Sequence, residues 1–298
     1  MIHMEETITH LHNHVEKLTV EIGERSVFFP ANHHKAAQYI EAFYTDHGFA
    51  VDMQGYSYKN MPVANICTEI KFSERPRKRY LVGAHYDSVH GTVGADDNAS
   101  AVAVQLETAR LLKSWSGSRD LDLAVKFVSF ALEEPPTFNT RYRGSRVYAR
   151  QARQANEQID GMLCLEMVGY RCHQPGCQKY PFPLMFVGYP EAGNFIGIVG
   201  NFKSRDFTGQ LYQAFARHPA LPVIKQTVPF SGWFMPSVRL SDHSSFWDQG
   251  YRAVMITDTA YFRNPHYHLA SDTMDKLDFS FMAEVVRSLL IFFADHRG

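Results

Sequence analysis

The sequence has almost no net charge, because 30 lysines and arginines are balanced by 31 aspartates and glutamates. A chain without an excess of positive charge has no general attraction for nucleic acids or for acidic membrane surfaces. No apolar run approaches the roughly 18 residues that a membrane-spanning helix needs, and the first residues lack the apolar core of a signal peptide. We therefore expect a cytoplasmic protein that binds neither nucleic acid nor a membrane.

Cysteine is scarce as well, with 4 residues in a chain of 298. This number is too small for the disulfide framework of a compact secreted domain. Cys67 and Cys164 lie in apolar runs and are expected to be buried thiols. Cys172 and Cys177 flank a turn-like loop, without a second Cys or His pair at the spacing of a zinc site. A disulfide and two free thiols are equally open for this pair.

Internal repeats and low-complexity segments are absent, and the chain is 45% hydrophobic. A chain of this length can bury one large core, so we expect a single domain over residues 1–298. Short apolar runs, many of them apolar on both faces, alternate with helical patterns. This alternation predicts an α/β fold, a three-layer α/β/α sandwich with helices on both faces of a central sheet.

The expected elements can be read from these patterns. The strands are expected at 63–70, 80–85, 123–132, 162–168, 183–188, 223–228 and 253–257. The helices are expected at 34–47, 99–112, 145–156, 207–217 and 279–295. Gly48 is a plausible stop for the first helix, and Asp278 is a plausible cap for the last.

Polar side chains occur where the expected strands end. In sheets covered by helices, ligands bind beyond the carboxyl ends of the strands. A further aspartate, Asp97, lies in a glycine-started loop just before the helix that opens at Ala99. We expect these groups to meet at one edge of the sheet. The side chains at the strand ends are His85, Asp87, Glu133, Glu134, Glu166 and His268.

The spacing of these residues suits a metal site. In an extended backbone His85 and Asp87 share one face, so Asp87 can accept from the imidazole N–H that does not bind metal. Asp97 has two oxygens and can bridge two metal ions about 3.5–4 Å apart. Imidazole and carboxylate without thiolate suit Zn²⁺, with Mn²⁺ or Co²⁺ as possible substitutes. The expected metal ligands are His85, Asp97, Glu134, Glu166 and His268.

Several short motifs occur in a fixed order over about two-thirds of the chain. They are Gly83-Ala84-His85-Tyr86-Asp87-Ser88, the stretch 94–100, Glu133-Glu134, Gly144-Ser145-Arg146, Ser241-Asp242-His243, Tyr267-His268 and Asp272-Thr273. In these motifs the chain resembles the co-catalytic zinc exopeptidases of metallopeptidase family twenty-eight. That family includes leucyl-type aminopeptidases, with glutamate carboxypeptidases and glutaminyl cyclases as relatives. The resemblance implies a mixed, mostly parallel sheet and two zinc ions per chain.

The resemblance also implies how the ligands are divided. It places His85 and Glu166 on one metal ion, and Glu134 and His268 on the other. Asp97, directly before Asn98, would bridge the two ions.

The remaining site residues take their roles from the same resemblance. Glu133 would be the general base that accepts a proton from the metal-activated water and delivers it to the leaving nitrogen. Asp87 and Asp242 would support the site. Tyr267 resembles a tyrosine that in some members of the family steadies the tetrahedral intermediate.

One ligand departs from the pattern of the family. Its usual Asp-Met motif is replaced here by Glu166-Met167. The extra methylene allows coordination if the backbone retreats by a comparable distance. In aminopeptidases of this kind the same carboxylate also helps to hold the free amine of the substrate, so the substitution bears more on the reaction than on the metal site.

Substrate contacts are expected from an aromatic segment near Asp242. Trp233 and Phe234, among glycine and proline, would form a wall of the substrate pocket together with Asp242, or would pack over the sheet edge. The arginines at 143, 146, 150 and 153 have the spacing of one solvated helix face, although Arg143 or Arg146 could bind a substrate carboxylate. Most other histidines, including His14 and His33, are expected at the surface.

These observations together predict a zinc-dependent exopeptidase that acts on peptides or amino-acid derivatives. Hydrolysis of the N-terminal peptide bond, by an aminopeptidase, is the leading interpretation. Two alternatives use the same fold: a glutaminyl cyclase with a single zinc ion, and a carboxypeptidase or dipeptidase. The oligomeric state is not predicted.

Overall fold

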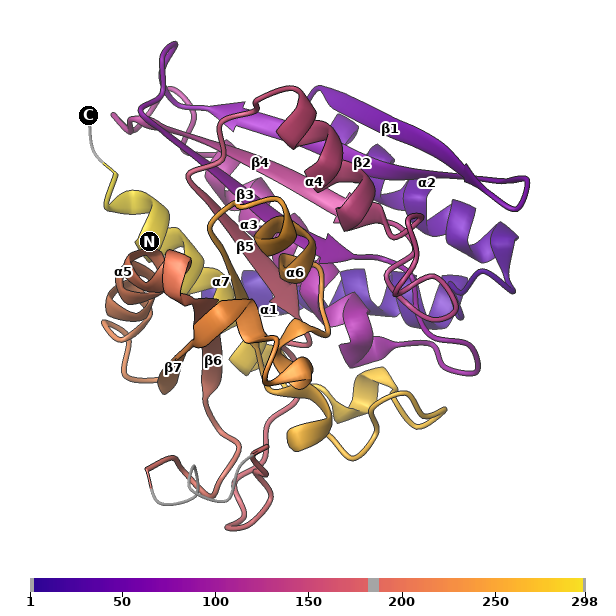
Figure 1. The fold of residues 1–298 in the computed structure, drawn as a ribbon, viewed down its shortest axis with the longest axis vertical. Coiled ribbons are helices and arrows are strands. Elements are labelled where there is room, and N and C mark those ends of the chain that lie inside the picture. The colour runs from indigo at the N-terminus through magenta and orange to yellow at the C-terminus, as the bar shows by residue number, and fades with distance from the viewer. Residues whose placement is uncertain (1–2, 182–187, 297–298) are drawn as a thin grey trace.

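A computed structural model describes residues 3–181 and 188–296. Within these residues the strands form one eight-stranded sheet, in the order β1-β2-β4-β3-β5-β8-β6-β7 (Figure 1). The strands are β1 (Val51–Tyr58), β2 (Met61–Lys71), β3 (Lys78–His85), β4 (Leu123–Phe130), β5 (Gly161–Glu166), β6 (Ile196–Asn201), β7 (Val223–Val228) and β8 (Ala253–Thr257).

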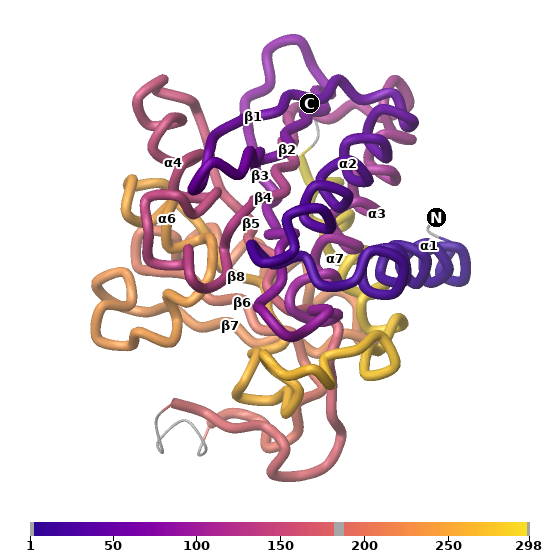
Figure 2. The backbone as a smooth tube through the Cα atoms, turned by 90° about the vertical axis from the view of Figure 1, so that its right-hand side faces the viewer, coloured from indigo at the N-terminus to yellow at the C-terminus, as the bar shows by residue number. Residues whose placement is uncertain are grey.

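Helices cover both faces of this sheet. One face carries α1 (Met4–Glu16), α2 (Pro30–Asp46), α3 (Ala101–Lys113), α5 (Arg205–Phe215) and α7 (Phe279–Ala294), which pack on one another over the larger apolar core. The other face carries α4 (Gly144–Gln154) and α6 (His243–Asp248), and Figure 2 shows these two helices on the opposite side of the strands. The expected α/β sandwich is confirmed.

Shorter helical segments connect these elements. Two of them are π-helical, η1 (Lys17–Ile22) and η2 (Ala95–Ser100), and η2 leads directly into α3. The others are single turns: η4 (Phe202–Ser204), η5 (Pro229–Gly232), η6 (Pro236–Arg239), η7 (Ala260–Phe262) and η8 (Met274–Lys276).

Strand directions decide where the site forms. The neighbours β4, β3, β5 and β8 are parallel, and β7 is parallel to β6. The pairs β1–β2, β2–β4 and β6–β8 are antiparallel, so the sheet is mixed, with more parallel than antiparallel pairs. His85 is level with Phe130, and Glu166 with Thr257. The carboxyl ends of four parallel strands therefore meet at one edge of the sheet.

Most of the expected elements are present, and each expected helix lies within about one turn of its observed position. The side chain of Asp278 caps α7 by accepting from the backbone N–H of Phe281 at 2.9 Å. The strands β1 and β6 were not expected from the sequence. The strand expected at 183–188 lies almost entirely outside the described residues.

The four cysteines are divided as two pairs. Cys172 and Cys177 form a disulfide, one of the two possibilities left open by the sequence. Cys67 and Cys164 are buried free thiols, as expected. No helix in the ranges 3–181 and 188–296 is both long enough and apolar enough to cross a membrane. The cytoplasmic location stays a prediction.

Candidate active site

The five expected metal ligands meet at the carboxyl edge of the sheet. Two groups share Asp97: the first contains His85 and Glu166, and the second contains Glu134 and His268. A third group joins His85 with Glu133 and Glu134. Within each group the ligand atoms all lie within 4.8 Å of one another. The structure therefore brings together residues that are far apart in the sequence, in the division that the resemblance implies.

Asp97 lies between the two histidines. Its Oδ1 is 3.3 Å from Nε2 of His85, and its Oδ2 is 3.2 Å from Nε2 of His268. Nε2 of His85 is also 3.6 Å from Oε2 of Glu166, and Nε2 of His268 is 3.4 Å from Oε2 of Glu134. Each oxygen of Asp97 thus faces a different histidine, the arrangement required of a carboxylate that bridges two cations.

Unpartnered polar atoms indicate that this cluster accommodates a cation. Among the described residues, Nε2 of His85, Oδ1 of Asp97 and Oε1 of Glu134 are buried without a hydrogen-bond partner. Buried polar atoms are rarely left in this state unless an ion or a water molecule completes them. A donor set of imidazole nitrogens and carboxylate oxygens fits zinc.

The protonation of the cluster reflects its crowded charges. Burial, with the charge of Asp97, raises the pKa of Glu134 to about 8. Burial alone would lower the pKa of His268, but its contacts with Asp97 and Glu134 outweigh burial and raise it to about 10. The raised pKa of His268 favours a proton on the imidazole where a cation would contact it. Metal binding at such a site displaces protons.

Asp87 joins the ends of β3 and β4. Its Oδ1 accepts from the backbone N–H of Glu133, and its Oδ2 accepts from that of Glu134, both at 3.0 Å. Nδ1 of His85 lies 3.3 Å from Oδ1 of Asp87 and 3.2 Å from its carbonyl oxygen. One buried carboxylate therefore orients the imidazole and fixes the backbone of both glutamates.

Two other side chains fix the loop that carries Asp97. Asp272 accepts from the backbone N–H groups of Asp96 and Asp97, at 2.9 and 3.1 Å. Asn98 accepts from the N–H of Met167 and donates to the carbonyl oxygen of Leu165, which ties the loop to the end of β5. Asp272 was recognised only as part of a motif, because its partners are more than 170 residues away.

Arg25 is a supporting residue that sequence reasoning missed. Its side chain is fully buried. Nε donates to the carbonyl oxygen of Tyr86 at 2.8 Å, Nη1 to that of Val93 at 2.6 Å, and Nη2 to that of Gly94 at 3.0 Å. Arg25 thus links the loop after His85 to the loop before Asp97. No local signal around residue 25 indicates this role.

Arg143 holds the predicted general base, and its position corrects an expectation. The solvated helix face expected from the arginine spacing is wrong for Arg143, which is buried at the start of α4, whereas Arg150 and Arg153 are exposed. Nη2 of Arg143 donates to Oε1 of Glu133 at 2.8 Å, and Nε donates to Oδ1 of Asp242 at 3.3 Å. The carboxylate of Glu133 balances the charge of the buried Arg143, whereas an arginine on a solvated helix face would be hydrated by water.

The predicted substrate-binding residues differ in their exposure to solvent. Asp242 is completely buried behind Arg143, which fits the supporting role and offers no surface to a substrate. Trp233 and Phe234 are exposed at 67% and 76%. Trp233 lines a pocket together with Arg143, and Phe234 packs against Phe230 with ring centroids 5.5 Å apart.

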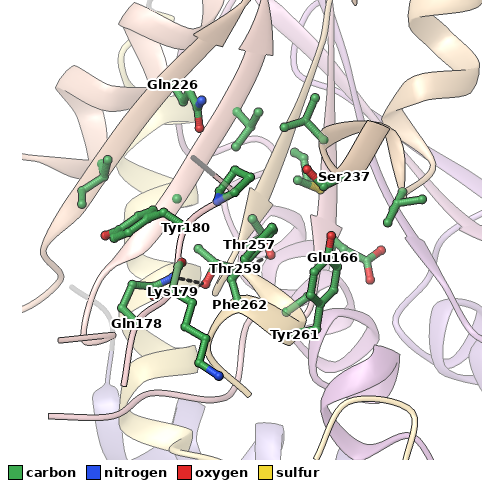
Figure 3. A pocket seen from close by; sticks show the side chains of 18 of the residues that line it. Glu166, Gln178, Lys179, Tyr180, Gln226, Ser237, Thr257, Thr259, Tyr261 and Phe262 are labelled. Carbon is green, nitrogen blue, oxygen red and sulfur yellow. Dashed lines mark hydrogen bonds between the residues drawn. The ribbon is translucent and has the colours of Figure 1, made fainter. Parts of the chain in front are cut away.

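Another pocket, mostly apolar, opens beside Glu166. It contains open space of about 830 Å³, its solvent-filled mouth included, and Tyr267 lines it. Figure 3 shows Glu166 at one side of this pocket and Tyr180 and Gln226 at the other. The ring of Tyr267 stacks on His268 at 3.8 Å between centroids. The hydroxyl of Ser241, a residue with no predicted role of its own, donates to Oε2 of Glu166 at 2.5 Å.

Comparisons with known proteins agree with this site. The sequence model of Peptidase family M28 matches residues 65–292. The chain is 36% identical to the uncharacterized protein YfbL of Escherichia coli over 284 residues, 93% of this chain and 84% of that protein. It is 28% identical to a probable leucine aminopeptidase of Arthroderma otae over 218 residues, 68% of this chain. The chain spans about half the length of this fungal relative, which it covers to 50%.

Solved structures share the fold. The LapA aminopeptidase of Legionella pneumophila superposes with a TM-score of 0.72 at 17% identity, covering 100% of this chain and 76% of that chain. A glutaminyl cyclase of Tannerella forsythia superposes with a TM-score of 0.69 at 19% identity, covering 99% of both chains. At these identities the likeness concerns the architecture alone.

Proposed function

Because this chain belongs to peptidase family M28, we propose that it is a zinc-dependent aminopeptidase that hydrolyses the N-terminal peptide bond of its substrates. The observation that carries the proposal is the shared position of Asp97 between two groups of ligand atoms, with Glu133 beside them. A single-metal site has no need for a carboxylate whose two oxygens face different histidines. The probable leucine aminopeptidase of Arthroderma otae lends support from sequence.

The proposed ligands are His85 and Glu166 for one zinc ion, Glu134 and His268 for the other, and Asp97 for both. When bound, zinc ions at such a site would lower the pKa of the attacking water and polarise the scissile carbonyl group. The protein supplies the remaining parts of the reaction.

Glu133 is the proposed general base and later the general acid. Its Oε1 accepts from Arg143, which leaves Oε2 to take the proton from water and return it to the leaving nitrogen. The bonds from Asp87 to the backbone of Glu133 and Glu134 fix where that oxygen lies. Tyr267 lines the pocket beside Glu166, and its hydroxyl is the proposed donor to the developing oxyanion.

The pocket beside Glu166 is the proposed site for the side chain of the N-terminal residue. Its lining is mainly aromatic and aliphatic, which favours an apolar residue. Glu166 faces this pocket with Oε2 fixed by Ser241 and is the proposed partner of the substrate's free amine. A peptide held in this way would place its first carbonyl group near the metal ligands.

Mass spectrometry of three peptides incubated with zinc-loaded protein tests the proposal. One peptide has both ends free, the second an acetylated N-terminus, and the third an amidated C-terminus. Loss of N-terminal residues that acetylation blocks would establish an aminopeptidase. Trimming from the other end, blocked by amidation, would make the protein a carboxypeptidase.

Glutaminyl cyclization is the second candidate function. The observation that favours it is the fold of the Tannerella forsythia enzyme, which covers 99% of both chains. The two groups of ligand atoms around Asp97 support the peptidase instead. Release of ammonia from a peptide with N-terminal glutamine, without cleavage of any peptide, would decide for the cyclase.

A further inference from the structure

A second pocket adjoins the one that contains Glu166, and Arg143 connects it to the candidate active site. Leu240 lines both pockets. Arg143 lines the second pocket while it donates to Glu133 at 2.8 Å, so one guanidinium separates this pocket from the proposed general base. Charged and aromatic residues of its wall include Arg146, Arg239, Asp248 and Trp233.

The wall of this pocket carries more positive than negative charge. Its lining contains three arginines and one aspartate. Two of the arginines have carboxylate partners: Arg143 contacts Glu133 and Asp242, and Arg239 contacts Asp248 at 2.6 Å. These three carboxylates equal the three arginines in number, but they contact only two of them, so the third arginine has no carboxylate partner of its own.

That third arginine is Arg146, which is half-buried on α4. Among the described residues no carboxylate lies within 4.0 Å of its guanidinium, and its hydrogen bonding is confined to Nη1, which donates to the carbonyl oxygen of Thr140 at 3.1 Å. Burial, followed by the charge of Arg143, lowers its pKa, although the charge of Asp248 acts in the opposite direction. Nε and Nη2 make no hydrogen bond with the described residues, so this edge of the guanidinium can donate to a ligand.

Two other residues of the pocket wall, Arg239 and Trp233, are held by contacts with their neighbours. The guanidinium of Arg239 lies 4.2 Å from the ring centroid of Trp233, and its Nη1 donates to the carbonyl oxygen of Ser231 at 2.7 Å. A planar guanidinium edge with two donors matches a carboxylate, which it binds through two parallel hydrogen bonds. Trp233 offers an adjacent apolar surface at 67% exposure.

We infer that this pocket binds a carboxylate on the leaving portion of the substrate, with Arg146 as its main partner. The inference rests on the proposed function and makes it more specific. A free C-terminal carboxylate close to the scissile bond would make short peptides the preferred substrates. An acidic side chain after the scissile bond offers the same chemistry, and the experiment separates these two sources.

Matched peptides test the inference by kinetics. The tripeptide Leu-Ala-Ala is compared as free acid and as C-terminal amide, and Leu-Glu-Ala-amide is compared with Leu-Gln-Ala-amide. We expect kcat/KM to be about tenfold higher for the charged member of at least one pair, the range for a partly exposed charged hydrogen bond. The first pair identifies a C-terminal carboxylate and the second an acidic side chain.

Two variants test whether the preference for charged peptides arises in this pocket. R146Q is expected to bring the ratio for the charged and neutral peptides close to one. R150Q, an exposed arginine one turn further along α4, is expected to keep the ratio of the unaltered protein. Equal kcat/KM values for charged and neutral peptides in the unaltered protein, or a preference that survives in R146Q, would overturn the inference.

If no peptide is cleaved, the proposed aminopeptidase activity is wrong. A binding measurement still tests the carboxylate pocket in that case. Ala-Ala and Ala-Ala-amide are titrated into the protein, and the fluorescence of Trp233 is followed, with W233F to assign the signal. Saturable binding of the acid alone, lost in R146Q, supports the carboxylate pocket. Equal responses to acid and amide, or none to either, refute it.

Discussion

The Nη2 of Arg25 donates to the carbonyl oxygen of Gly94 at 3.0 Å, although 69 residues separate them in the chain. Gly94 begins the loop that carries Asp97 and has a positive φ of 56°. A Cβ at this position would lie 2.2 Å from the carbonyl oxygen of Asp97. The loop is therefore shaped by a residue that must be glycine and is anchored by a buried guanidinium from the N-terminal part of the chain.

We expect Arg25→Lys to weaken zinc binding. A lysine keeps the charge but cannot reach Tyr86, Val93 and Gly94 together, since its donors sit on one nitrogen. Loss of a group that orients metal-binding loops typically costs about 10–100-fold in metal affinity. Competition between the protein and a chelator measures this affinity.

Arg205→Lys, at an exposed position, is the control. Unchanged zinc affinity in Arg25→Lys would show that the loops keep their shape without this anchor.

Glu133→Gln and Glu134→Gln should affect different properties, turnover in the first variant and zinc binding in the second, although the residues are neighbours. Glu133→Gln retains an oxygen that can accept from Arg143 but cannot take a proton, so turnover should fall by about 10²–10⁴-fold while both zinc ions stay bound. Glu134→Gln removes a predicted ligand charge and should lose zinc. Metal content by elemental analysis and peptide turnover are measured on the same samples. Near-normal turnover in Glu133→Gln would remove it from the role of base.

Several of the candidate site residues could be read from the sequence because they follow apolar strands directly or within a few residues. His85 and Glu166 are the last residues of β3 and β5, and Glu133 follows β4 by three residues. Where short buried strands end, a run of polar residues stands out. Because these strands run parallel to one another, their carboxyl ends lie at the same edge of the sheet.

Other parts of the molecule depend on contacts that no local pattern contains. The strand β6 was missed because Gly197 and Gly200 weaken its strand pattern. A Cβ at Gly200 would lie 2.1 Å from Oγ1 of Thr208, so the glycine is needed for the close approach of α5. Arg143 was misplaced for a similar reason. Its spacing fits the solvated face of α4, and only the distant Glu133 and Asp242 explain its burial.

Ser241→Ala should weaken one metal position while leaving the other intact. The hydroxyl of Ser241 fixes Oε2 of Glu166, the longer side chain that replaces the usual aspartate of the family. Without this bond the carboxylate gains freedom to turn away from His85, and affinity at that position should fall by about tenfold or more. A zinc titration should then resolve one tight and one weakened equivalent.

Ser245→Ala is the matched control, since Ser245 is also buried in this region but contacts Ser145. Two equally tight equivalents in Ser241→Ala would contradict a role for the hydroxyl in holding Glu166.

A buried histidine that is not among the proposed metal ligands should make the protein sensitive to acid. His14 was expected at the surface, but α1 buries it, and its Nδ1 lies 2.6 Å from the hydroxyl of Tyr39. Burial, followed by the charges of His10, His47 and Arg110, lowers its pKa to about 3. The unfolded chain binds a proton here below the ordinary pKa of about 6.5, whereas the folded protein resists it.

The sign of the effect follows from this difference. Above pH 6.5 neither state binds the proton, so the contribution of His14 to the free energy of unfolding is constant. As the pH falls from about 6.5 towards 3, the unfolded state gains a proton that the folded state lacks, and stability declines. At pH 4.5 the expected loss is about 2–3 kcal/mol.

His14→Asn removes this titration and keeps an amide near the position of Nδ1. Urea unfolding of the metal-free proteins at pH 7 and pH 4.5 should show a smaller loss of stability in His14→Asn than in the unaltered chain, by about 2–3 kcal/mol. His34→Asn, at an exposed position of α2, should follow the unaltered chain. A parallel pH dependence in His14→Asn would mean that His14 takes up its proton within the folded protein. The acid sensitivity would then arise at other buried histidines such as His33, whose pKa burial also lowers, to about 4.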